Sequence, residues 1–163
     1  MYPGIIPGYN EQVPDYRVGF DLVASLVAGF RSFAALRALA GDAREAAVCA
    51  ERARAAARLV EEVWWDGTRG RYHDFVDAAG TLAHGDGSSA LAALYWRVTD
   101  DPARIRSALE HLERRAPDLP PDAVEVGSHL PEILYRHGRA EAAFGAMSRL
   151  VRSRRREYPE VSF

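Results

Sequence analysis

The sequence predicts an all-helical fold, and three observations lead to this prediction. Alanine, the strongest helix former, supplies 28 of the 163 residues, and all 21 basic residues are arginine, which is nearly as favourable in helices. Apolar side chains recur at helical spacing in segments that are bounded by glycine, proline or aspartate. A content of 48% hydrophobic and 27% charged residues suits a globular core and excludes a disordered or collagen-like chain.

Turn and cap signals divide the chain into six helices. Gly41 is a good end for the first helix, Asp42 is a plausible N-cap of the second, and Pro102 suits the first turn of the fourth. After the second helix, a glycine-rich turn and an alternating stretch predict a short β-like hairpin near residues 66–76. The expected helices cover 18–40, 43–65, 88–98, 102 to a proline break at 117–121, 127–137 and 139–152.

The helices differ in how much of their surface is apolar. The second, fourth and sixth each carry one charged face, whereas the first, third and fifth are apolar or small-residue on most sides. This alternation predicts helical hairpins in which buried inner helices alternate with half-buried outer ones. The inner helices begin near residues 18, 88 and 127, so the repeat has no fixed sequence period.

Net charge and targeting signals bear on two questions: whether the protein binds nucleic acid or membranes, and in which compartment it lies. A formal net charge of −2 gives no broad basic surface, so we expect no nucleic-acid and no membrane partner. The N-terminus lacks the features of a signal peptide, and the longest apolar stretch, around residues 22–30, is too short to span a bilayer. The lone Cys49 suits a reducing compartment, and we expect a cytoplasmic protein.

Three stretches resemble the six-hairpin, or (α/α)6-toroid, glycosidases. They are WWDGTRGRYHD at 64–74, the acidic loop, buried helix and Asp-Pro-led helix at 85–113, and VEVGSHLPEILYRHGRAEAA at 124–143. The closing EYPEVSF resembles a loop before another inner helix, so the resemblance covers roughly 16–163. It implies about half of a toroid, with residues 1–163 the C-terminal or central portion of a longer domain. Such a piece would be inactive alone and could self-associate through its open hairpin edges.

The resemblance also implies a carbohydrate substrate and hydrolysis by two carboxylic acids, one as general acid and one as general base. In these toroids the substrate enters by the loops that lead into the inner helices. The acids there are the candidate catalytic residues, with Glu160 the favoured base, although each also suits a cap, turn or surface role: Asp15, Asp86, Glu125 and Glu160. The candidate sugar-binding side chains are Tyr16, Tyr72, Trp96, His129 and Tyr158.

Two alternatives remain open on the sequence. The related N-acylglucosamine 2-epimerases use histidines as acid and base, and both His84 and His129 lie near entrances to expected inner helices. A non-catalytic helical scaffold that binds a partner on its concave face is the second alternative. The five histidines show no metal-ligand spacing on one helix and there is only one cysteine, so no metal or cofactor is expected.

Overall fold

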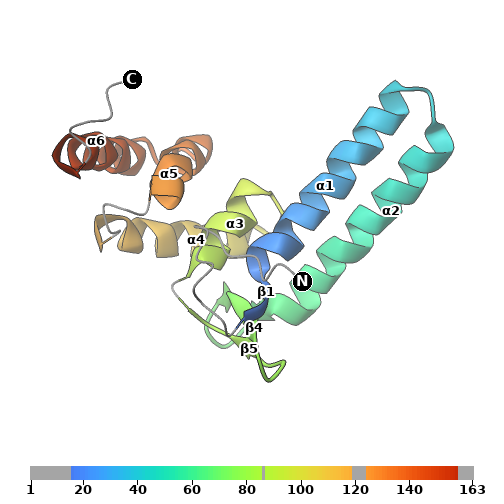
Figure 1. Cartoon of the computed structure of the whole chain (residues 1–163), viewed down its shortest axis with the longest axis horizontal. Coiled ribbons are helices and arrows are strands. Elements are labelled where there is room, and N and C mark those ends of the chain that lie inside the picture. The colour runs from blue at the N-terminus through green and yellow to red at the C-terminus, as the bar shows by residue number, and fades with distance from the viewer. Residues whose placement is uncertain (1–15, 86, 119–123, 158–163) are drawn as a thin grey trace.

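The structure, a computed structural model, describes residues 16–85, 87–118 and 124–157. Six α-helices make up most of these ranges, as the sequence predicts (Figure 1). They are α1 (Phe20–Leu39), α2 (Ala43–Leu59), α3 (Ser88–Tyr95), α4 (Pro102–Arg115), α5 (Val124–Arg136) and α6 (Ala140–Glu157). One π-helical turn, Val60–Trp64, extends α2, and a 3₁₀ turn, Ala116–Asp118, extends α4.

Short strands join the helices near the start of the described chain. The hairpin predicted near residues 66–76 is present as β2 (Trp65–Asp66) paired with β3 (Arg71–Tyr72). A second, three-stranded antiparallel sheet consists of β1 (Tyr16–Gly19), β4 (Phe75–Asp77) and β5 (Leu82–Ala83), in the order β1-β4-β5. The sequence did not predict this sheet, because strands of two to four residues are too short to show a two-residue period.

The helix starts agree with the capping signals. The Asp42 carboxylate accepts a hydrogen bond from the Glu45 amide at 3.1 Å, and the Asp101 carboxylate accepts from the amides of Ala103 and Arg104. Each carboxylate therefore satisfies donors that lack a partner inside the helix. Three boundaries differ from the prediction by three residues or more. Helix α3 ends at Tyr95 rather than near 98, α5 begins at Val124 rather than near 127, and α6 ends at Glu157 rather than near 152.

Helix α3 lies at the centre of the fold and joins its two hydrophobic clusters. Leu91 and Leu94 belong to the cluster shared with α4, α5 and α6. Ala92 and Ala93, on the other side of α3, pack into the cluster that contains Phe20 of α1 and residues of the π turn. The prediction that this helix is buried nearly all round is confirmed.

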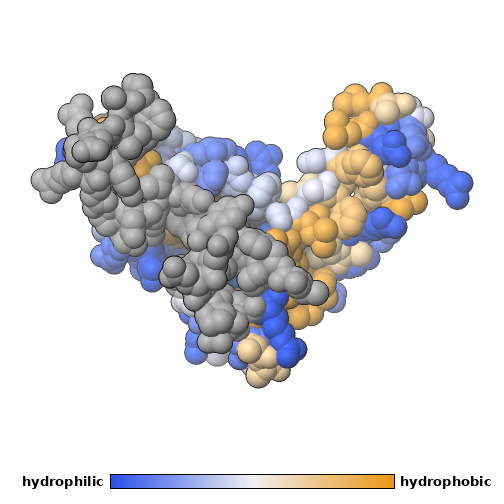
Figure 2. All heavy atoms as spheres, viewed as in Figure 1, coloured by the Kyte–Doolittle hydropathy of each residue, from blue (hydrophilic) through white to orange (hydrophobic). Residues whose placement is uncertain are grey.

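Helix α1 forms an antiparallel hairpin with α2 that extends away from the other helices (Figure 1). Its buried residues, Phe20, Asp21, Ala24 and Val27, all lie in its first half. In the second half Leu39 is 87% exposed, so the expectation of a buried first helix is wrong there. Figure 2 shows the resulting apolar surface along this arm of the molecule.

The length of α1 also corrects the expectation that the apolar stretch around residues 22–30 is too short to span a bilayer. Over Phe20–Leu39 its length and hydropathy are sufficient for a membrane span, although only 11% of the apolar window is buried within the structure. The same length and composition suit an inner helix of a helical protein, because such a helix touches neighbours on every side.

Candidate functional site

The connection between α2 and α3 gathers polar side chains beside the N-terminal ends of α1 and α3. Asp66 begins its first turn, where the carboxylate oxygen Oδ1 accepts hydrogen bonds from the amides of Thr68 and Arg69 at 2.9 and 3.1 Å. The indole ring of Trp65 lies against the guanidinium of Arg104 at 4.6 Å, which ties this turn to α4.

Asp74 holds the loop that leads into α3. One of its carboxylate oxygens accepts from the Gly85 and Gly87 amides at 2.7 and 3.3 Å, and the other accepts from the Ser89 amide at 2.9 Å. The side chain is only 6% exposed, so these bonds compensate a buried charge. In addition, the Asp74 carbonyl accepts from the Phe20 amide at the start of α1.

Asp66, His73 and His84 form a polar cluster in the same connection. Nε2 of His84 lies 3.0 Å from Oδ2 of Asp66, and the two histidine rings stack with their centroids 4.3 Å apart. The hydrogen bond from His84 is the main cause that lowers the pKa of Asp66 to about 2. Burial, followed by the neighbouring His84, lowers the pKa of His73 and favours its neutral form at pH 7.

Asp21 is a buried acid in the first turn of α1. Its side chain is 8% exposed, and Oδ1 has no hydrogen-bond partner among the described residues. Burial raises the pKa of this carboxyl, while hydrogen bonds from the backbone amides of Leu22 and Asp21 oppose the rise. A carboxyl that keeps its proton to a higher pH than usual is suited to proton donation.

Gly87 marks the closest approach of α4 to the entrance of α3. Its φ of +83° is a left-handed conformation, and a Cβ there would lie 2.0 Å from Nε2 of His111. His111 is half-buried, and burial followed by the nearby Arg71 lowers its pKa. Only glycine fits this position without displacing the ring.

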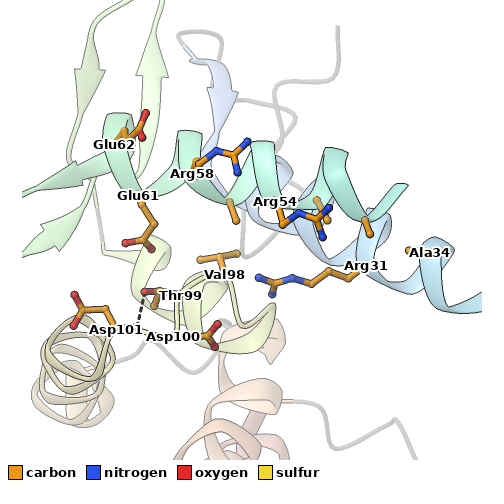
Figure 3. A pocket seen from close by; sticks show the side chains of 13 residues that line it. Arg31, Ala34, Arg54, Arg58, Glu61, Glu62, Val98, Thr99, Asp100 and Asp101 are labelled. Atoms are coloured by element: carbon orange, nitrogen blue, oxygen red, sulfur yellow. Dashed lines mark hydrogen bonds between the residues drawn. The ribbon is translucent and has the colours of Figure 1, made fainter. Parts of the chain in front are cut away.

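A groove of about 640 Å³ opens between the α1–α2 hairpin and the segment after α3 (Figure 3). Arg31, Arg54 and Arg58 line one part of it, and acidic side chains, including Glu61 and Asp100, line another. The groove meets α3 at its C-terminal end, away from the entrances of α1 and α3. Among the described residues that line it, none is an acid predicted to be catalytic.

Comparison with protein families then identifies the chain. Residues 16–123 match the Mannosylglycerate hydrolase MGH1-like glycoside hydrolase domain. The chain belongs to this family. The match includes α1 to α4, both small sheets and the whole polar connection described above.

Among solved structures, this glycoside hydrolase domain is similar to the GH78 family rhamnosidase of Bacillus sp. GL1. The TM-score is 0.61 at 23% identity, over 88% of this chain and 14% of the rhamnosidase chain. The likeness shows a shared fold, and the chain spans only a small part of that relative. A search of curated proteins finds no significant match.

In the glycoside hydrolase domain, most predicted catalytic acids lie outside the described residues. This applies to Asp15, Asp86 and Glu160, and to the predicted sugar-binding Tyr158. Glu125 lies inside α5, which corrects the expectation that it precedes the helix, since α5 begins one residue before it. Tyr16 is the first residue of β1.

The other predicted sugar-binding residues are dispersed. Tyr72 is 1% exposed and donates its hydroxyl to Glu61 at 2.7 Å, so it offers no ring face to a sugar in this structure. Trp96 caps the C-terminal end of α3, the end opposite the entrance. The ring of His129 lies 4.4 Å from that of Tyr95, the last residue of α3, whereas His84 contacts Asp66 and His73. The two histidines of the epimerase hypothesis thus have different surroundings.

The sequence reasoning did not select Asp21, Asp66 or Asp74. Asp66 belongs to a turn that the sequence indicates, but its partners His73 and His84 follow two different strands, β3 and β5. Asp21 lies in an apolar helix where a single acid is unusual, and that contrast was the available signal.

Proposed function

We propose that this glycoside hydrolase domain contributes to the hydrolysis of a glycosidic bond, with Asp21 as the proton donor to the leaving oxygen. Membership of the family supports a carbohydrate substrate. The observation that carries the residue assignment is the buried carboxyl of Asp21 at the start of α1, whose Oδ1 has no hydrogen-bond partner among the described residues and whose pKa is raised by burial. A general acid in such a site holds its proton until the glycosidic oxygen accepts it.

The complementary base must come from the same entrance side. Asp86 is one candidate from the sequence, where it stands between Gly85 and Gly87, whose amides donate to the Asp74 carboxylate. Asp15, Glu125 and Glu160 stay candidates from the sequence. A base that activates water opposite the acid requires a separation of about 6.5–9.5 Å between the two carboxyl groups, as in inverting enzymes.

We further propose that the domain is one part of a larger (α/α)6 toroid. The exposed apolar side chains in the second half of α1, including Phe33, Leu36 and Leu39, support this, because inner helices of a closed ring are covered on every side. Either further helices of the ring or a second copy of the chain would cover them.

The test is a hydrolysis assay of the longest natural form of the protein on a panel of aryl glycosides and on mannosylglycerate, the substrate in the family's name. The Asp21→Asn variant should lose at least about 100-fold in rate, because general acid catalysis contributes that much or more. Glu160→Gln tests the favoured base in the same way. Asp42→Asn is the matched control, since asparagine caps a helix as well as aspartate does.

Two results would contradict the proposal. A full rate in Asp21→Asn would remove this residue from the mechanism. If the folded, longest natural form hydrolyses no substrate in the panel and binds none of them, a partner-binding scaffold becomes the better interpretation.

A further inference from the structure

We propose that Asp66, His73 and His84 form a binding site for a divalent transition-metal ion, with Zn²⁺ the ion of best fit. One ligand atom from each residue lies within 4.8 Å of the other two. Two imidazoles and one carboxylate are a donor set that zinc and similar ions use, with the remaining positions left to water. The proposal is independent of the proposed hydrolysis.

The distance between the first two ligands already suits an ion. Nε2 of His84 and Oδ2 of Asp66 are 3.0 Å apart. Two atoms bound to zinc at about 2.0–2.1 Å with roughly tetrahedral angles are themselves about 3.3 Å apart. Replacing the hydrogen bond between these atoms by two bonds to one ion therefore needs a shift of only a few tenths of an ångström.

The carboxylate is oriented for this role by its own turn. Oδ1 of Asp66 is occupied by the amides of Thr68 and Arg69, which leaves Oδ2 directed at the histidines. Outer hydrogen bonds of this kind fix a ligand before the ion arrives. The Arg69 guanidinium lies 3.9 Å from Oδ2 and competes with a cation, but its side chain is 59% exposed and can turn into solvent.

The backbone brings the three ligand segments together without the ion. The β2–β3 hairpin pairs Asp66 with Arg71, and the His73 amide donates to the Trp64 carbonyl at 2.8 Å. The next amide, that of Asp74, donates to Ala83, the residue before His84, at 2.9 Å. Little conformational entropy is therefore left to lose on binding.

Two buried nitrogen atoms of the histidines that lack hydrogen-bond partners give a second argument for metal binding. Nδ1 of His73 and Nδ1 of His84 are both buried without a hydrogen-bond partner among the described residues. Buried polar atoms without partners are rare, and two in one cluster call for an explanation. The rings are inclined by only 23°, and near-parallel rings cannot both direct a lone pair at one ion. Binding must therefore turn one ring. We expect this to be His73, because the His84 ring is already directed at Asp66.

The experiment titrates the full chain with Zn²⁺ after chelator treatment and measures stoichiometry by calorimetry. We expect one ion per chain and at least a tenfold weaker dissociation constant in Asp66→Asn, His73→Gln and His84→Gln. The control His137→Gln, on the segment after α5, should bind like the wild type. At 100 times the dissociation constant, Zn²⁺ should raise Tm by about 5 °C or more in the wild type and the control alone.

Co²⁺ gives a readout that does not depend on the stability of any variant. In the wild-type chain its visible d–d bands should show nitrogen and oxygen ligation, and its near-ultraviolet spectrum should show no thiolate charge-transfer band. A thiolate band would place the ion at Cys49 and overturn the proposal. Equal Zn²⁺ affinity in the wild type and in folded His73→Gln, or no binding in the wild type, would overturn it as well.

Discussion

At the scale of single residues, two buried carboxylates have opposite surroundings. Asp74 accepts three backbone hydrogen bonds, whereas Oδ1 of Asp21 accepts none from the described residues. Hydrogen bonds from backbone amides stabilise the ionised carboxylate, whereas burial without them disfavours the ionised form. We therefore expect Asp74 to stabilise the fold. We expect Asp21 to lower the free energy of unfolding, a cost that a functional role would explain.

Replacement of Asp74 by alanine should destabilise the domain by about 3 kcal/mol or more, because three amides lose a charged acceptor in a buried place. Asp77→Ala is the matched control, since Asp77 accepts one side-chain hydrogen bond, from the Thr81 amide in an exposed turn, and should cost about 1 kcal/mol. Urea unfolding measures both. Equal losses in the two variants would contradict the role given to Asp74.

Asp21 should make the stability of the domain fall as the pH rises. Its folded pKa lies above the ordinary 3.8, so the folded state holds the proton more tightly than the unfolded chain. The free energy of unfolding then declines from pH 3.8 upward through the folded pKa and stays low at pH 7. Asp21→Asn should remove this decline and leave the domain more stable than the wild type at pH 7. Urea unfolding at a series of pH values tests this, and an Asn variant less stable than wild type at pH 7 would refute it.

At the scale of elements, the entrance of α3 depends on one glycine. Gly41 and Gly87 both have positive φ, but a Cβ at Gly41 meets nothing within 4 Å, whereas one at Gly87 collides with His111. Gly41→Ala should cost about 1 kcal/mol, the strain of a left-handed alanine. Gly87→Ala should cost at least about 2 kcal/mol more, since the half-buried ring must move.

The double variant Gly87→Ala with His111→Ala separates the two causes. Removing the ring removes the collision, so thermal unfolding should show much less than the sum of the two single losses. A strictly additive double variant would mean that the backbone strain alone accounts for the cost.

The elements also show what the sequence can reveal. The caps at Asp42 and Asp101 involve residues two or three positions apart, so local patterns predict them. The pairing of Tyr16 with Asp77 joins distant segments through very short strands, and no local pattern indicates it. Tyr72 is a candidate sugar-binding residue on the sequence because it lies near a loop, but the antiparallel β2–β3 pair places it against Phe20 and Trp65.

The candidate site was harder to predict than the helices, because its side chains come from segments that are distant in the sequence. The resemblance to the toroid glycosidases pointed to acids that precede inner helices, and Glu125 shows how a three-residue error in a helix start changes such an assignment. Burial and missing partners single out Asp21, and neither can be read from the spacing of residues.

At the scale of the whole molecule, the α1–α2 hairpin carries apolar surface that is open to solvent. Leu36 and Leu39 are 61% and 87% exposed. If this surface drives self-association, replacing both residues by glutamine should reduce the concentration dependence of the sedimentation coefficient. The folded chain should change in stability by less than about 0.5 kcal/mol, because both side chains already lie in solvent. Unchanged association would show that other surfaces mediate it.

The bonds of Asp74 have a consequence for the time course of folding. Its carbonyl meets the Phe20 amide, 54 residues earlier, and its carboxylate meets amides up to 15 residues later. Closing the longer loop costs entropy before any of its contacts is gained. The α1–α2 hairpin, whose contacts are mostly local, can form early, whereas the junction between α1, the sheet and α3 must wait for this closure. The entrance of the proposed active site is therefore the part of the domain that we expect to assemble last.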